Sequence, residues 1–263
     1  MPTFRHGRGT KVLVGGYDLT SMFREAQIQR SMDTAETTAF GSTVKSYVPG
    51  MIDANVSLSG MFSAGASDVD PVLNNIFGSS TTSPVTVMYD NPGTGSGMVA
   101  GQRSNLGEGY ESSYGVSGSV GDMVAISAEV KPTLGFIGGW SLQDITSQTP
   151  GTANGTTVDL DNGMGLTWPL TTAKFFANIH VTANTLSGAG NIAMVIEHSA
   201  ASNMSGAATI LTPTTLLSSS GVYGETKRVT VNTTLNRYVR IRYTYSVTLT
   251  GNFTLHASFG YHY

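Results

Sequence analysis

Alternation between apolar and polar side chains is the main pattern along this chain, and it predicts β-strands. Segment 238–243 alternates strictly, with Val239, Ile241 and Tyr243 on the face expected to be buried. Segment 253–262 repeats the pattern, and its apolar face holds Phe253, Leu255, Ala257, Phe259 and Tyr261. Segments 27–32 and 51–62 alternate in the same way. Successive side chains of a strand point to opposite faces, so each segment should cover a core with one face.

One segment has the period of a helix instead. Between residues 68 and 77 the apolar positions fall at helical spacing, and they are Val69, Val72, Leu73, Ile76 and Phe77. Ser67 or Asp68 can cap the first turn, and Gly78 suits the position after the last. We therefore predict one helix in a chain that is otherwise made of strands.

A polar stretch, residues 33–50, separates two of the predicted strands and has no firm period. It is longer than the ~2–5 residues of a usual hairpin loop. It also carries apolar side chains whose exposure to water is costly. We interpret it as an ordered loop that contacts another subunit, with a disordered loop as the alternative. The candidate contact residues are Asp33, Glu36, Thr38, Phe40, Lys45, Tyr47, Val48 and Pro49.

A segment rich in Gly, Pro, Thr and Asn predicts the boundary between two domains. We expect an assembly domain over residues 1–147, a linker over 148–155 and an outer domain over 156–263. Strands punctuated by turns after the linker indicate an antiparallel β-sandwich. The predicted fold class is all-β, a sandwich or barrel with one flanking helix followed by a second sandwich.

Composition removes several classes of protein. Charged residues make up 12% of the chain, against a usual share of about 25%. The chain has no Cys, which excludes disulfides, zinc–thiolate sites and Cys nucleophiles. The net charge of −3 is too small to predict a general nucleic-acid binder. No apolar run is long enough to span a membrane, and the N-terminus lacks the apolar region of a secretory signal.

Each candidate chemical motif has a simpler structural explanation. The glycines of 95–100 match a dinucleotide-binding loop, but no helix follows to hold a pyrophosphate. Segment 159–163 offers clustered oxygens for calcium, yet it lacks EF-hand spacing and ends in the hairpin-turn pair Asn162–Gly163. The histidines lack metal-ligand spacing, and His180 and His256 lie within predicted strands, where we expect them to face solvent or a hydrogen-bonding neighbour. We predict no cofactor, no metal site and no catalytic residue, and therefore no enzyme.

Cations and aromatic side chains mix in the last predicted strands, as they do in proteins that bind single-stranded nucleic acid. The residues are Arg237, Tyr238, Arg240, Arg242, Tyr243 and Tyr245. Alternation places Tyr243 and Tyr245 opposite Arg240 and Arg242. This separation favours a solvated sheet face or a subunit interface over a stacking surface.

Short runs in the first half of the chain resemble the tail tube (major tail) proteins of long-tailed bacteriophages. The runs are 33–41, 45–50, 56–60, and the helix 68–77 with the strand that begins at Pro84. The resemblance covers about half of the chain, and it rests on element order and short runs rather than on a catalytic signature. It implies a β-sandwich or barrel flanked by a helix, assembled as hexameric rings that stack into a tube through which DNA passes.

The resemblance also implies a role, a location and partners. The chain would be a structural virion protein of the tail, made in the host cytoplasm, that forms the channel for DNA ejection. Its partners would be copies of itself, other tail proteins, and genomic DNA that passes without specific binding, with no membrane partner. The second half resembles outer β-sandwich domains of phage structural proteins, and its closing strands resemble those of other virion proteins.

That second half leaves two alternatives open, because it departs from a minimal tube subunit. One is a capsid decoration or cement protein. The other is a carbohydrate-binding module of a tail adsorption device, which would need an exposed aromatic platform. Trp140 and Trp168 are the only tryptophans that could contribute to one.

The distribution of charge predicts an acidic channel wall. Residues 1–140 hold 8 Lys and Arg against 12 Asp and Glu, a net charge of −4. Unpaired cations in a channel would bind phosphates, whereas carboxylates repel them. The candidate lumen residues are Asp53, Glu108, Glu111, Asp122 and Glu129, with Asp33 and Glu36 of the contact stretch. The alternative is that these acids only keep an outer face soluble.

Overall fold

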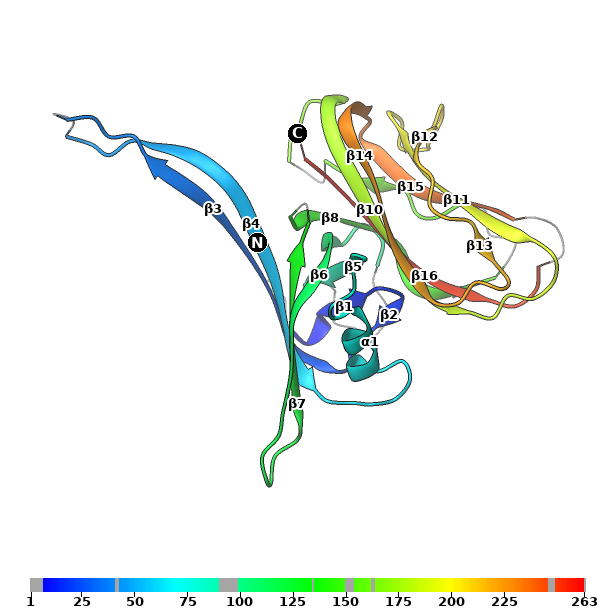
Figure 1. The fold of residues 1–263 in the computed structure, drawn as a ribbon. Coiled ribbons are helices and arrows are strands. Elements are labelled where there is room, and N and C mark those ends of the chain that lie inside the picture. Colours follow the sequence, from blue (N-terminus) through cyan, green and yellow to red (C-terminus); the bar gives the residue numbers. More distant parts are fainter. Residues whose placement is uncertain are drawn as a thin grey trace. The chain divides into compact units, whose positions relative to one another are not determined.

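The computed structural model describes residues 7–40, 43–89, 99–133, 135–149, 154–161, 164–245 and 249–262. These residues form antiparallel β-sheets, a 3-10 turn η1 (Gly7–Gly9) and one α-helix, which confirms the all-β prediction (Figure 1). The chain divides into two compact units. Unit 1 comprises Met1–Ser21, Ser83–Gly107 and Ile137–Tyr263, and unit 2 comprises Met22–Thr82 and Glu108–Phe136.

This division differs from a single boundary at residues 148–155. Strand β8 (Ile137–Gln148) pairs with β16 (Phe253–His262), so the residues just before the expected linker belong with the C-terminal strands. Strand β1 (Lys11–Val14) near the N-terminus also lies in unit 1. Residues 150–153 of the expected linker lie outside the described residues. Antiparallel pairing joins segments that are far apart in the sequence, and local composition does not report this.

Unit 2 is an antiparallel sheet in the order β3–β4–β7–β6, with one helix. Strand β4 (Tyr47–Met61) pairs with β3 (Phe23–Glu36) on one side and with β7 (Ala125–Pro132) on the other. Strand β7 pairs in turn with β6 (Arg103–Ser117), whose residues from Glu108 onward belong to this unit. Helix α1 (Val69–Ile76) lies between β4 and β5 (Ser83–Met88) in the chain.

The two faces of this sheet differ in polarity. The buried face of β4 and β7 carries Ala54, Val56, Leu58, Ile126, Ala128 and Val130. The opposite face carries polar groups. The alternation predicted for segment 51–62 is confirmed from Ala54 to Met61, whereas residues 51–53 are exposed on both faces. Tyr114, which is paired with Ala128, contacts Asp70 through its hydroxyl and Phe77 through its ring at 6.4 Å. Helix α1 therefore lies on the apolar side of the sheet.

The helix occupies the predicted segment, although its N-terminus is not capped as expected. The Asp68 carboxylate accepts hydrogen bonds from Ser63 Oγ and from Gly65 N (3.0 Å) rather than from the first helical turn. At the other end Phe77 N donates to Leu73 O (2.9 Å), and Gly78 follows with φ +74°. Asp68 thus fixes the loop before the helix, and glycine allows the left-handed turn that ends it.

Stretch 33–50 is mostly strand, which corrects the prediction of a long loop. Strand β3 continues to Glu36, and its register with β4 includes the pairs Thr34–Pro49 and Glu36–Tyr47. The connection is 37–46, of which 41 and 42 lie outside the described residues. Both faces of this part of the hairpin are exposed. The sequence therefore has no apolar period there that could have indicated strands.

Unit 1 contains two sheets. The first has the strands β12 (Ala208–Leu211), β11 (Asn191–Ser199), β15 (Tyr238–Tyr245) and β9 (Val158–Asp159), with β13 (Leu216–Leu217) also paired to β11. The strands of the second, in order, are β14 (Tyr223–Leu235), β10 (Leu170–Asn184), β16, β8, the start of β6, β5 (Ser83–Met88), β1 and β2 (Tyr17–Asp18). The buried core includes Phe175, Ile196, Ile241, Phe253 and Phe259.

The other face of β10 and β16 is buried as well. His180 and His256 were expected to face solvent or a hydrogen-bonding neighbour, and the structure places both in the interior. His180 Nε2 lies 2.8 Å from Thr86 Oγ1 of β5, and His180 Nδ1 lies 2.6 Å from the carbonyl oxygen of Gly15. His256 Nε2 lies 2.6 Å from Ser258 Oγ. Strand β5 thus covers a face that the sequence pattern marks as polar.

Candidate assembly surfaces

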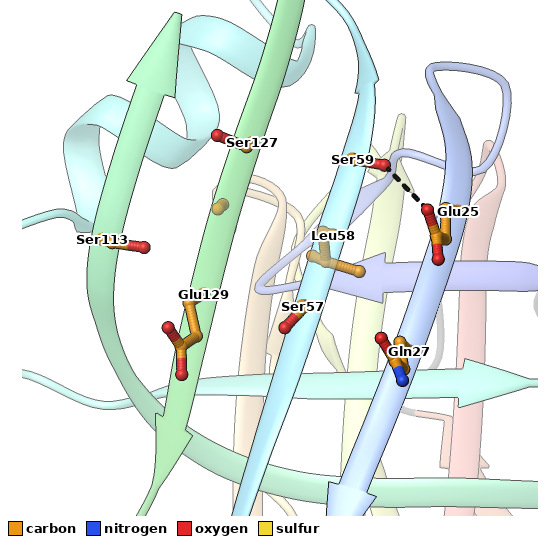
Figure 2. Close-up of a pocket in the computed structure, with 9 residues that line it drawn as sticks. Glu25, Gln27, Ser57, Leu58, Ser59, Ser113, Ser127 and Glu129 are labelled. Carbon is orange, nitrogen blue, oxygen red and sulfur yellow. Dashed lines mark hydrogen bonds between the residues drawn. The ribbon is translucent and has the colours of Figure 1, made fainter.

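A polar groove crosses the open face of the unit 2 sheet (Figure 2). Its volume is about 270 Å³, and all four strands contribute to it. The lining residues are Glu25, Gln27, Ser57, Leu58, Ser59, Ser113, Ser127, Ala128 and Glu129. Most of these side chains end in a hydroxyl, amide or carboxylate group. The face therefore offers water small polar groups rather than an apolar pocket.

Carboxylates determine the charge of this polar face. Glu129 accepts a hydrogen bond from Asn55 Nδ2 (3.0 Å) and lies 3.3 Å from Lys131 Nζ. These two hydrogen bonds lower the pKa of Glu129, so the group is ionised at neutral pH. Lys131 Nζ also lies 3.8 Å from the Asp53 carboxylate. The ammonium group at this face is thus offset by two carboxylates.

Two of the predicted lumen residues, Asp53 and Glu129, lie on the polar face. Tyr110 is the cross-strand partner of Lys131, so it points to this face, and Glu108, two residues earlier in β6, points to the same side. Glu25 is a further carboxylate of this face that sequence reasoning missed, and Ser59 Oγ donates to it at 3.5 Å. Extending the polar alternation of segment 27–32 backward by two residues would have found it.

The other two predicted lumen residues lie elsewhere in unit 2. Glu111 is paired with Val130 and is buried on the opposite face, where burial raises its pKa to about 8. A bulge between Glu111 and Ser113 shifts the register at this point, and a sequence pattern does not show it. Asp122 lies in the β6–β7 connection and accepts a hydrogen bond from Ser119 Oγ (2.6 Å).

All of the predicted contact residues lie in residues 32–52, which we call the hairpin extension. It continues past the part of β4 that pairs with β7, which starts at Val56. Thr38 is half-buried, and the other predicted contact residues are exposed. Lys45 Nζ lies 3.1 Å from Glu36 Oε2, and Thr37 N donates to Ser46 O (2.8 Å). Specific contacts therefore hold the end of the hairpin extension together.

Large apolar side chains remain uncovered on the hairpin extension. They are Met32, Phe40, Val44, Tyr47, Val48, Met51 and Ile52. Met51 is 79% exposed and Ile52 is 73% exposed. Sequence reasoning missed these two because it assigned them to a strand with one buried face. Full burial of such a side chain is worth about 1.5–3 kcal/mol, so the hairpin extension favours a partner.

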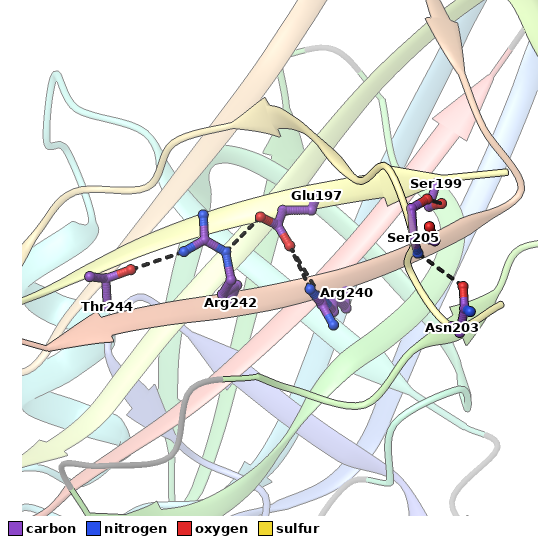
Figure 3. Close-up of polar contacts among 7 residues, drawn as sticks. All are labelled: Glu197, Ser199, Asn203, Ser205, Arg240, Arg242 and Thr244. Atoms are coloured by element: carbon purple, nitrogen blue, oxygen red, sulfur yellow. Dashed lines mark hydrogen bonds and ion pairs between the residues drawn. The ribbon is translucent and has the colours of Figure 1, made fainter. Parts of the chain in front are cut away.

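Guanidinium groups on the outward face of β15 in unit 1 are held by a carboxylate (Figure 3). Glu197 accepts Arg240 Nη2 (3.1 Å) at one oxygen and Arg242 Nε (2.6 Å) at the other. Arg242 Nη1 also donates to Thr244 Oγ1 (3.1 Å). The predicted outward placement of both arginines is confirmed. Because Glu197 already pairs them, they do not form a row of unpaired cations for nucleic-acid phosphates.

The carboxylates considered for calcium also have protein partners. Asp159 accepts two hydrogen bonds from Arg237, at 2.8 and 2.7 Å. Asp161 Oδ1 accepts Leu166 N (2.8 Å) and Trp168 Nε1 (3.4 Å). Asn162 and Gly163 lie outside the described residues, as do 90–98 in the glycine-rich loop. Within the described ranges, no group of three or more His, Cys, Asp or Glu side chains could hold a metal ion.

Neither tryptophan forms the exposed platform that a carbohydrate-binding module would need. Trp140 is 2% exposed, and the Arg103 guanidinium lies over its ring at 4.4 Å. Trp140 stacks on Tyr261 at 5.5 Å, and the half-buried Trp168 meets the same ring edge-on at 5.8 Å. These aromatic side chains therefore serve the packing of unit 1.

Comparison with known proteins gives a likeness of fold. No family model and no curated protein matches the chain. The chain is similar to a protein in the virion of a native gene transfer agent particle, with 14% identity and a TM-score of 0.42, over 51% of this chain and 98% of that one. It is similar to the SPP1 tail tube protein, with 12% identity and a TM-score of 0.41, over 51% of this chain and 78% of that one.

A third similar structure spans both units. It is the SPP1 Dit protein, described as a hub adsorption apparatus of phages that infect Gram-positive bacteria. Identity is 10% and the TM-score 0.38, over 97% of this chain and 99% of that one. These neighbours come from a virion, a tail tube and a tail hub. No helix in the described part of the chain is long and apolar enough to cross a membrane.

Proposed function

We propose that this chain is a structural subunit of a phage-type tail tube, and that its copies assemble into stacked hexameric rings around a channel for DNA. The observation that carries the proposal is the hairpin extension. Strand pairing orders it, yet its large apolar side chains lie in water. Patches of this kind mark interaction sites, and a neighbouring copy would cover this one. The virion tail is the location that follows.

The polar face of unit 2 supports the channel wall in this proposal. Unpaired Lys or Arg would bind the phosphates of a duplex and slow its passage. On this face the positive charge of Lys131 is balanced by the carboxylates of Asp53 and Glu129. Arg30 is the cross-strand partner of Ala54 and therefore lies on the opposite, apolar face. Carboxylates repel phosphates, and the small hydroxyls between them are neutral, so they add no positive charge that would hold the duplex. We assign Asp53, Glu108 and Glu129 to the wall, with Glu25 added.

Replacement of the hairpin extension tests the proposal. Ser31 and Asp53 are paired across β3 and β4, so an Asn-Gly turn can replace residues 32–52 without changing the register. We expect this variant to fold as a monomer and to lose assembly in sedimentation and electron microscopy. A Val231→Ser control removes an exposed apolar side chain from unit 1 and should assemble normally. Tubes formed by the shortened variant would refute the proposal.

A second candidate function is a ring component at the tail tip, and unit 1 favours it. A wall and a stacking hairpin need only unit 2, whereas unit 1 adds two sheets with their own buried core. Particles labelled through an exposed residue of unit 1, such as Val231, separate the possibilities. Label along the tail supports the tube, label at the tip supports the second candidate, and label on the head supports capsid decoration.

A further inference from the structure

Unit 2 has a second end with exposed apolar side chains. We call it the loop end, and its residues are Phe62, Val116, Val120, Met123 and Val124. Phe62 N donates to Val124 O (2.9 Å), which joins the end of β4 to the β6–β7 connection. The Val120 side chain is fully exposed, and Met123 is 64% exposed. Like the hairpin extension, this surface is costly to leave in water.

The register places the loop end and the hairpin extension at opposite ends of one strand. Tyr47 of β4 is paired with Glu36 in the hairpin extension, whereas Met61 of β4 is paired with Ala125 beside the loop end. At about 3.3 Å per residue, the length of β4 separates them by about 45 Å. Figure 1 shows the β3–β4 and β6–β7 hairpins projecting in opposite directions from the sheet. Within one chain, neither surface can cover the other.

Arg24 at the loop end and Asp33 on the hairpin extension have opposite charges, and neither makes an ion pair with another described residue. Asp122, which also lies at the loop end, accepts a hydrogen bond from Ser119 Oγ. At the loop end, Arg24 Nη2 donates to the sulfur atoms of Met61 (3.2 Å) and Met123 (3.8 Å). Thioether sulfur is a weak acceptor, so this guanidinium can still bind a carboxylate. On the hairpin extension, Asp33 is exposed and makes no ion pair with another described residue.

We propose that the loop end of one copy receives the hairpin extension of the next copy, with Arg24 facing Asp33 across the contact. This inference rests on the proposed function, because it names the partner surface of the hairpin extension. Contact between two different surfaces of identical chains is heterologous, and it either closes into a ring or continues from copy to copy as a filament. Contact between two hairpin extensions would instead close a dimer and leave the loop end in water.

Cross-linking of single-cysteine chains tests which surfaces meet, because the full chain has no Cys of its own. Val48→Cys on the hairpin extension and Val120→Cys at the loop end are made in separate full-length chains, mixed, and treated with a short bis-maleimide. We expect a covalent dimer in the mixture and its loss when either chain is treated alone. Val231→Cys in unit 1 replaces Val120→Cys in the matched control and should give no dimer with Val48→Cys.

Parallel sedimentation and electron microscopy distinguish the two ways to fail. If the chains assemble but Val48→Cys cross-links only to itself, the head-to-tail contact is wrong and the proposed function stands. If the chains do not associate, both proposals fail. Charge reversal then tests the pairing itself, since Arg24→Asp and Asp33→Arg should each weaken assembly while the double variant restores it. A double variant as weak as the single ones would overturn the Arg24–Asp33 pairing.

Discussion

At the scale of single residues, the interior of unit 1 holds a histidine that must stay neutral. Burial lowers the pKa of His180 to about 4, against an ordinary value of 6.5. The unfolded chain therefore binds this proton more readily than the folded chain. The stability it contributes is present above pH 6.5 and is lost as the pH falls toward 4, by at most about 1.4 kcal/mol per pH unit.

His180→Gln should weaken this acid sensitivity, because glutamine can occupy a hydrogen-bonded position without titrating. Trp140 and Trp168 both lie in unit 1, so tryptophan fluorescence reports its unfolding. We expect the free energy of unfolding in urea to fall less between pH 7 and about pH 5 in the variant than in the parent chain. Equal slopes in the two proteins would show that His180 does not carry the effect.

Glu111 predicts the opposite pH dependence for unit 2. Burial raises its pKa to about 8, so the folded chain keeps the proton near neutrality. The stability it contributes is present below its ordinary value of 4.5 and is lost as the pH rises through 8. Glu111→Gln keeps a side chain that stays neutral at every pH. We therefore expect the rate of hydrogen exchange in β6 and β7, corrected for intrinsic exchange, to rise less between pH 7 and 9 in this variant than in the parent chain. Unchanged protection relative to the parent would contradict the prediction.

At the scale of elements, what could be predicted depended on how many faces of a strand are buried. The second half of β4 has one buried face, and its alternation was found. The hairpin extension has no buried face, so its strands had no period to show. Strand β16 is buried on both faces. The sequence pattern did not decide whether His256, on its polar side, faces solvent or a hydrogen-bonding neighbour, because burial of that side depends on strands far away in the sequence. Glu111 does not share the polar face with Asp53 and Glu129, because the bulge after it changes the alternation of β6.

At the scale of the whole molecule, the order of segments along the chain does not follow the units. Strand β8 lies between β16 and β6 in its sheet, and it brings Trp140 and Leu142 into the core of unit 1. The strands β1, β2 and β5 join the same sheet from before residue 90. Residues 156–263, expected from the sequence to form a domain, therefore lack several strands of the unit to which they belong.

This pairing predicts how fragments behave. Residues 152–263 alone leave one edge of β16 without β8, and uncover its core side chains, so we expect no cooperative unfolding transition. A chain with the three segments of unit 1, joined by a flexible linker after Ser21 and by a short turn between the paired β6 and β8, should unfold cooperatively.

Tryptophan fluorescence during urea titration compares this chain with the full-length protein. Because the short fragment lacks Trp140, circular dichroism follows it instead. A cooperative transition of residues 152–263 alone would show that the C-terminal strands fold without β8, and the boundary expected from the sequence would then hold.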